Sequence, residues 1–141
     1  MSVVSEIPAA PSHQALAHFQ AEFGFETDCW DVHVAITRGE KDFVLLDVRS
    51  HEAFESGHIA TAISLPHAKI IASRMAQWPQ DTLFVVYCGG PHCNGASRAA
   101  VRLARLNRPV KLMAGGITGW LDESLELQRE KANLGAAPAA Q

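Results

Sequence analysis

The sequence predicts one α/β domain built on a mostly parallel sheet. Short apolar runs rich in β-branched residues, at residues 43–47 and 83–87, are typical of strands that are covered on both faces. Segments of helical pattern separate these runs, and strands that alternate with short helices indicate a parallel sheet. The chain has 141 residues, of which 48% are hydrophobic and 19% charged, and this suits one domain with a sizeable core.

The N-terminal part of the chain is expected to add a helix to this core. We expect residues 1–11 to form a loose arm, after which Ser12 caps a helix that runs to about Phe23. Leu16, Phe19 and Phe23 share one side of this helix. That apolar side predicts that the helix packs on the domain.

A second helix is expected at about residues 29–38. Thr27 or Asp28 can cap its N-terminus, because short polar side chains accept hydrogen bonds from the first free amides of a helix. We expect Trp30 and Ile36 to anchor this helix in the core. Cys29 is expected to be buried and inert.

Five further elements follow from the pattern of apolar residues and breakers. Residues 25–27 suit a short strand, and residues 43–47 form the best-defined strand. Residues 52–56 suit a short helix, and residues 62–65 a brief strand. We expect residues 67–78 to form one helix. Its inner face would carry Ile70, Ile71 and Met75.

The last part of the domain repeats the strand-then-helix pattern. A helix from about Ala96 to Asn107 follows the strand at 83–87, and a strand at 110–113 leads to a helix at 117–122. Gly115 and Gly116 are expected to allow a tight turn between the last two. Residues 125–133 are ambiguous, and residues 134–141 form an Ala/Pro tail. We therefore divide the chain into an arm with an added helix (1–24), the domain (25–128) and a tail (129–141).

Cys88 directly follows the strand at 83–87 and precedes a loop with three glycines. A cysteine at the carboxyl end of a parallel strand, facing the start of a helix, lies where α/β sheets place their chemistry. A free thiol has a pKa of about 8.5, which helix N-termini and nearby cations lower, and the thiolate is the nucleophile. The loop glycines can let backbone amides turn inward to hold an anion. The alternative is that Cys88 is a small buried hydrophobe, and the spacing leaves both open.

Composition excludes several classes of function. The formal net charge of −3 does not suggest a nucleic-acid or membrane binder, so we expect neither partner. No apolar run reaches the roughly 18 residues that span a bilayer, and residues 1–11 lack the features of a signal peptide. Three cysteines without a disulfide-framework spacing indicate a reducing compartment, so we expect a cytoplasmic protein.

Three blocks of sequence together resemble the rhodanese-like domain, a family of sulfurtransferases. The resemblance runs from about Thr27 to Leu127. The first block is Leu46-Asp47-Val48-Arg49 with Glu52, Phe54, Gly57-His58-Ile59, Ala62 and Leu65-Pro66. The second is Val85-Val86-Tyr87-Cys88 with Ser97-Arg98-Ala99-Ala100, and the third is Gly115-Gly116-Ile117 with Trp120.

The resemblance implies a three-layer α/β/α fold with a central, mostly parallel sheet. It also implies that Cys88 takes a sulfur atom from a donor such as thiosulfate as a persulfide and passes it to a thiol or cyanide, without a cofactor. The persulfide would rest in a cradle formed by Gly89, Gly90, His92, Cys93, Asn94, Gly95, Ala96 and Ser97, with Arg98 as the nearby cation. Asp47 and Arg49 would be supporting residues, Asp47 accepting from loop amides and Arg49 pairing with Glu52. Direct contact of Arg49 with the substrate is the alternative, and His58 would support the fold.

One departure from the family pattern concerns the spacing of the arginine. The family's usual loop has four residues between cysteine and arginine, an interval that separates Cys93, not Cys88, from Arg98. Either Cys88 is the nucleophile in an enlarged loop, or Cys93 has taken that role. We favour Cys88, because the preceding strand fixes its backbone. Cys93 would then be a resolving thiol that forms a disulfide with Cys88, or a spectator.

Two other functions remain as alternatives. The domain could relay persulfide to a partner protein, with the N-terminal helix and the basic face of the later helix as docking surfaces. A wider loop also resembles those of related phosphatases and arsenate reductases, although the loop has no acidic residue to protonate a leaving group. Cys88, His92 and Cys93 lack the second ligand pair that is typical of zinc sites, so we expect no metal.

Overall fold

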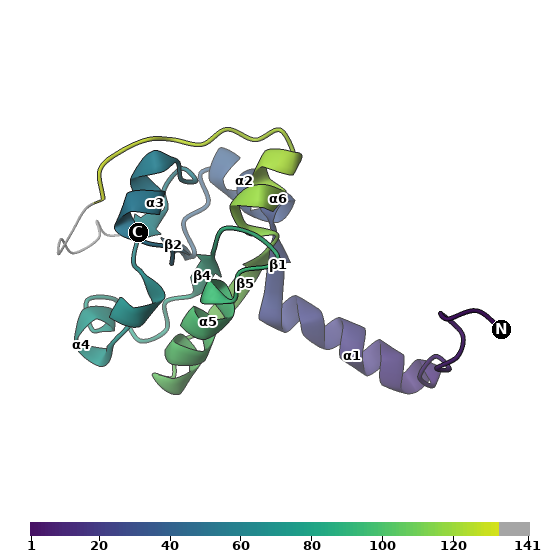
Figure 1. The fold of residues 1–141 in the computed structure, drawn as a ribbon. Coiled ribbons are helices and arrows are strands. Elements are labelled where there is room, and N and C mark those ends of the chain that lie inside the picture. Colours follow the sequence, from purple (N-terminus) through teal and green to yellow (C-terminus); the bar gives the residue numbers. More distant parts are fainter. Residues whose placement is uncertain (133–141) are drawn as a thin grey trace.

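The computed structural model describes residues 1–132, which form a five-stranded sheet covered by helices (Figure 1). All neighbouring strands are parallel, in the order β1-β5-β4-β2-β3. In chain order the strands are β1 (Glu26–Asp28), β2 (Val44–Asp47), β3 (Ile63–Ser64), β4 (Phe84–Tyr87) and β5 (Val110–Ala114). The predicted α/β class with a central parallel sheet is confirmed.

Helices lie on both faces of the sheet. They are α1 (Ser12–Phe25), α2 (Cys29–Thr37), α3 (His51–Ser56), the 3₁₀ turn η1 (His67–Lys69), α4 (Ala72–Met75), α5 (Gly95–Arg105) and α6 (Gly116–Asp122). Residues of α4 and α5 pack with one face of β2 and β4, and residues of α2 and α6 pack with the other. This is the three-layer arrangement that the resemblance implies.

Strands β2 and β4 form the centre of the core. Every residue of both strands is buried, as their apolar runs predict. Alternate residues point to opposite faces, so Phe84 and Val86 join the cluster under α5, whereas Val85 and Tyr87 join the cluster under α2 and α6. The register pairs Asp47 with Tyr87, which brings both strands to an end at the same edge of the sheet.

Side-chain caps begin two helices, and the sequence predicted the first of them. The Asp28 carboxylate accepts a hydrogen bond from the Asp31 amide at 2.8 Å and caps α2. The Ser50 hydroxyl accepts one from the Ala53 amide at 3.1 Å and caps α3. Such caps satisfy amides that have no partner within the helix.

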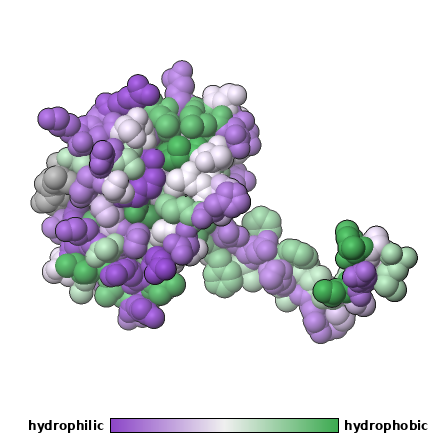
Figure 2. Space-filling view, in the orientation of Figure 1, coloured by the Kyte–Doolittle hydropathy of each residue, from purple (hydrophilic) through white to green (hydrophobic). Residues whose placement is uncertain are grey.

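The expectation for the N-terminal helix was wrong in two respects. Pro11, without a side-chain hydrogen bond, occupies the capping position of α1 in place of Ser12. No residue of α1 is buried, and Leu16 and Phe19 are 60% and 58% exposed. The helix projects from the body and joins it at its C-terminal end, so its apolar side chains lie on the surface (Figures 1 and 2). The reason is geometric: the helix points away from the domain on which it was expected to pack.

Two smaller expectations also failed. Residues 67–78 are not one helix, because Ile70 and Ile71 take extended backbone angles between η1 and α4. This break turns Ile71 outward, where it is 50% exposed, while Ile70 and Met75 stay buried. Trp30 is 51% exposed and does not anchor α2, whose buried residues are Cys29 and Val32.

Residues after α6 return across the body of the domain. Gln128 forms an isolated antiparallel bridge with His58, and the Trp120 indole donates to the Glu126 carbonyl at 2.9 Å. The expected Ala/Pro tail (134–141) lies outside the described residues. Within residues 1–132 no helix combines the length and apolar character needed to cross a bilayer.

Candidate active site

Cys88 directly follows strand β4 and lies at the carboxyl edge of the sheet, beside the start of α5. The side chain is 6% exposed and lies at the edge of the apolar cluster under α5. Its carbonyl accepts a hydrogen bond from the Ile117 amide at 3.1 Å, so the beginning of α6 holds the backbone at this point. The position predicted from the sequence is therefore occupied by a nearly buried sulfur with a fixed backbone.

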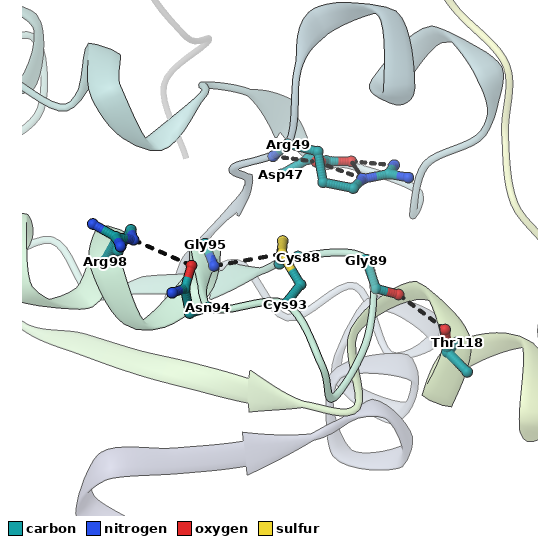
Figure 3. Close-up of a disulfide and its surroundings, with 9 residues drawn as sticks. All are labelled: Asp47, Arg49, Cys88, Gly89, Cys93, Asn94, Gly95, Arg98 and Thr118. Carbon is teal, nitrogen blue, oxygen red and sulfur yellow. Dashed lines mark hydrogen bonds and ion pairs between the residues drawn. A yellow bond between two sulfur atoms is a disulfide. The ribbon is translucent and has the colours of Figure 1, made fainter.

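Cys88 is joined to Cys93 by a disulfide across the loop (Figure 3). Their Cα atoms are 6.4 Å apart, and the Cys93 amide donates to the Gly90 carbonyl at 3.1 Å, which closes the loop into a turn. Cys93 is exposed, in contrast to Cys88. The Gly95 amide, at the start of α5, points at the Cys93 sulfur at 3.5 Å.

Glycines allow the backbone to approach both sulfur atoms closely. A Cβ atom on Gly95 would lie 2.9 Å from the Cys88 sulfur and 3.4 Å from the Cys93 sulfur. Gly116 has a φ of +57°, and a Cβ atom there would lie 2.4 Å from the Cys88 carbonyl oxygen. Gly115 also has a positive φ, which confirms the tight turn expected at this pair.

A hydrogen-bonded anchor fixes the other side of the loop. The Gly89 carbonyl accepts from both the amide and the hydroxyl of Thr118, at 2.9 and 3.1 Å (Figure 3). A Cβ atom on Gly90 would lie 2.7 Å from the Thr118 hydroxyl oxygen. Thr118 could not be recognised as a site residue from the sequence, because nothing in the local pattern shows that α6 packs against this loop.

A cavity of about 290 Å³ opens beside the disulfide. Five predicted site residues line it together with Pro91: Cys88, Gly90, Cys93, Ala96 and Ser97. Residues from β5 and the following turn form the opposite wall, and Glu26 of β1 contributes a carboxylate. Nothing in the local sequence marks Glu26 as a site residue, because only the pairing of β1 with β5 brings it to the cavity.

Arg98 lies on a neighbouring groove and does not line this cavity. Its guanidinium Nε donates to the Asn94 side-chain oxygen at 3.1 Å (Figure 3). Together with Arg102 and Arg105 it lines a groove of about 670 Å³ along α5. The predicted role of Arg98 as a cation for the substrate therefore requires a different rotamer from the one seen.

Asp47 and Arg49 form a buried ion pair near the loop. The fully buried Asp47 carboxylate accepts from the Arg49 amide at 3.1 Å and from its guanidinium Nη2 at 2.6 Å. Arg49 also donates to the Gly57 carbonyl, so its partner is not Glu52 as expected. Burial alone would lower the pKa of Arg49, but the hydrogen bonds and charge of Asp47 raise it.

Tyr87 completes this network from β4. Its hydroxyl donates to Asp47 Oδ2 at 2.8 Å and accepts from the Ile59 amide at 3.2 Å. Burial, reinforced by the negative charge of Asp47, raises the pKa of Tyr87 far above its ordinary value. The network ties the ends of β2 and β4 together, one residue before Cys88.

The remaining candidate residues are His58, Cys29 and His92. His58 is buried, stacks on Phe54 and lies within hydrogen-bond distance (2.9 Å) of the Phe54 carbonyl oxygen. Burial and the charge of Asp28 raise the pKa of the Cys29 thiol to about 11, which agrees with an inert cysteine. His92 is exposed on the loop, and in the described part of the chain no three His, Cys, Asp or Glu side chains are grouped to hold a metal ion.

Comparisons with known proteins find relatives of this chain in bacteria. The chain is 40% identical over 94 residues to the HTH-type transcriptional regulator Rv0324 of Mycobacterium tuberculosis, a match covering 61% of this chain and 41% of the regulator. The chain therefore spans less than half the length of that relative. It is 30% identical over 106 residues to the uncharacterized protein YibN of Escherichia coli, covering 68% of this chain and 73% of YibN.

A solved structure and a family model place the fold. The crystal structure of the BH2092 protein from Bacillus halodurans superposes with a TM-score of 0.81 at 35% identity, covering 84% of this chain and 87% of that one. The model of the rhodanese-like domain matches residues 31–123, which run from within α2 to the end of α6 and include the whole Cys88 loop. The chain is a member of the rhodanese-like domain family, whose members act in sulfur transfer or sulfur relay.

Proposed function

We propose that the protein is a sulfurtransferase in which Cys88 carries the transferred sulfur as a persulfide. The observation that carries this proposal is the position of the Cys88 sulfur at the end of β4. It lies against the first residue of α5, at a distance that only a glycine permits, beside an open cavity. A helix N-terminus favours an anion by its dipole and its free amides, so it favours the thiolate.

The reaction begins with Cys88 as a thiolate, after the disulfide has been reduced. The thiolate attacks the outer sulfur of a donor such as thiosulfate, a new S–S bond forms, and sulfite leaves with the electron pair of the broken bond. A thiol or cyanide then attacks the outer sulfur of the persulfide and restores the thiolate. The cavity of about 290 Å³ is large enough for a small donor of this kind.

The exposed Cys93 is the alternative nucleophile. It has the family interval to Arg98, and the Gly95 amide points at its sulfur. Cys88 is favoured because hydrogen bonds to α6 hold its carbonyl and that of Gly89, so its sulfur has a fixed position for in-line attack. Both thiols must be reduced for either role, so we propose that the protein works in the cytoplasm.

Turnover of freshly reduced cysteine variants tests this assignment. We expect Cys88→Ser to abolish initial thiosulfate:cyanide turnover, and Cys93→Ser to retain it. Intact mass after thiosulfate treatment should show the gain of one sulfur atom in Cys93→Ser and none in Cys88→Ser. Cys29→Ala is the matched control, because it removes a buried thiol that lies behind the cavity wall, against the Ala114 and Gly116 carbonyls, and does not itself line the cavity. Loss of turnover in Cys93→Ser alone would assign the nucleophile to Cys93 instead.

A relay to a protein acceptor is a second candidate, which one surface feature favours. Helix α1 has no buried residue and exposes Leu16, Phe19 and Phe23. Apolar surface is visible along this projecting helix in Figure 2. Exposed apolar surface of this kind is typical of interaction sites. The same mass measurement separates the two functions, because uptake of sulfur without cyanide turnover would favour the relay.

A further inference from the structure

We propose that Cys93 resolves the Cys88 persulfide within the chain and releases hydrogen sulfide, so that the protein reduces sulfane sulfur at the expense of a dithiol. This inference rests on the proposed function, because it needs a persulfide on Cys88. It adds a product, sulfide, and a class of co-reactant, a dithiol reductant. It follows from the pairing of the two sulfurs across the loop.

The geometry brings Cys93 to the sulfur atom that it must attack. In the disulfide the Cys93 sulfur is bonded to the Cys88 sulfur, which is the inner sulfur of the proposed persulfide. The turn closed by the Cys93 amide and the Gly90 carbonyl allows this pairing while β4 and α5 keep their places. Groups held this close react as if at a very high concentration, so an internal thiol competes well with external acceptors.

The step balances in atoms and electrons. The Cys93 thiolate attacks the inner sulfur of the Cys88 persulfide and forms the Cys88–Cys93 bond. The bond between the inner and outer sulfurs breaks, and the outer sulfur leaves with its electron pair as hydrosulfide. The two cysteines are thereby oxidised to the disulfide, and the transferred sulfur is reduced to sulfide.

The difference in exposure of the two cysteines indicates how the cycle is completed. Cys88 is 6% exposed, whereas Cys93 is exposed, so an external thiolate reaches the Cys93 sulfur more readily. Attack there gives a mixed disulfide on Cys93 and releases Cys88 as a thiolate at the start of α5, where the anion is favoured. The second thiol of the reductant then displaces Cys93 and forms the reductant's own disulfide. A dithiol therefore completes the cycle with one molecule.

A single-turnover experiment without added thiol tests the internal step. The full chain is reduced, freed of reductant, and mixed with one equivalent of thiosulfate. We expect the wild type to release about one sulfide per chain and to end with the mass of the disulfide form. We expect Cys93→Ser to release none and to keep the added sulfur atom. Cys29→Ala should behave as the wild type does.

The outcomes separate this inference from the proposed function. Wild-type protein that retains the persulfide, with Cys93 still open to alkylation, would overturn internal resolution while leaving Cys88 as the sulfur carrier. A Cys93→Ser variant that takes up no sulfur would instead contradict the proposed nucleophile. With cyanide as acceptor, wild-type turnover should decline as the disulfide accumulates and recover on addition of dithiothreitol. Turnover by Cys93→Ser should persist without it, and an equal decline in both proteins would also count against the inference.

Discussion

Replacing Tyr87 with phenylalanine removes one hydroxyl from the buried network that joins β2 to β4. The hydroxyl donates to Asp47 Oδ2 at 2.8 Å and accepts from the Ile59 amide at 3.2 Å. In the variant the carboxylate keeps the Arg49 guanidinium, but the fully buried Ile59 amide loses its partner. A hydrogen bond to a charged group contributes about 1.5–3 kcal/mol, and a buried donor left unpaired costs about 1–3 kcal/mol. The two contributions are not additive, because both arise from the loss of the same hydroxyl. We therefore expect the free energy of unfolding to fall by about 2–3 kcal/mol.

Urea unfolding measures this loss. The midpoint should fall while the slope of the free energy of unfolding against urea stays unchanged, since the exposed surface is the same. Thr118→Val is the matched control, because it removes an exposed hydroxyl that also forms a hydrogen bond, and we expect a change within about 0.5 kcal/mol. A loss below about 0.5 kcal/mol for Tyr87→Phe would refute the reasoning, because it would mean that the Ile59 amide finds another partner.

A titration to alkaline pH tests the buried environment of Tyr87 in a second way. Tyr87 is the only tyrosine in the chain, and burial raises its pKa in the folded state. A tyrosine in the unfolded chain ionises near pH 10. Below about pH 10 the contribution of Tyr87 to stability is fully present. It is lost as the pH rises further, because the unfolded state then releases a proton that the folded state keeps. We therefore expect tyrosinate absorbance to appear only on unfolding. Tyrosinate absorbance near pH 10 from protein that is still folded would contradict the buried position.

Three further predictions concern the loop, the third cysteine and the projecting helix. Gly116→Ala should destabilise the protein by about 2 kcal/mol or more, because its Cβ atom would lie 2.4 Å from the Cys88 carbonyl oxygen. Gly89→Ala, with nothing within 4 Å of the added Cβ atom, should change the urea midpoint little, and equal losses would refute the steric argument. In the reduced protein at about pH 8, iodoacetamide should label Cys93 well before Cys29, whose thiol pKa is raised to about 11; peptide mass mapping over time would reveal the opposite order. Phe19→Ser should shift the free energy of unfolding by less than about 0.5 kcal/mol, since Phe19 is 58% exposed, and a larger loss in thermal unfolding would show that α1 is packed.

Much of the fold could be predicted from local pattern. The apolar runs identified β2 and β4, and Asp28, one of the two residues expected to cap the second helix, caps α2. The position of Cys88 at the end of β4 also followed from the sequence, as did its pairing with Cys93 as one of two alternatives. These features depend on residues that are close in the chain, so a single sequence contains the information.

Contacts between distant residues could not be predicted in the same way. Arg49 was expected to pair with Glu52, one turn away, but it pairs with Asp47, which Tyr87 also contacts from the neighbouring strand. Arg108, which the sequence analysis passed over, is buried and donates to the carbonyls of Met75 and Trp78. A charged side chain is read as exposed unless the carbonyl groups that satisfy it are known.

By itself the sequence determined the class of fold, the central strands, the cap of α2 and the cysteine at the edge of the sheet. The tertiary structure alone decided which side chains share the cavity with that cysteine. It placed Glu26 in the cavity wall, turned Arg98 toward a neighbouring groove and left the apolar side of α1 uncovered. The physical reason is that strand order and helix direction bring together residues far apart in the chain. Periodicity and capping describe only the few residues on either side of each position.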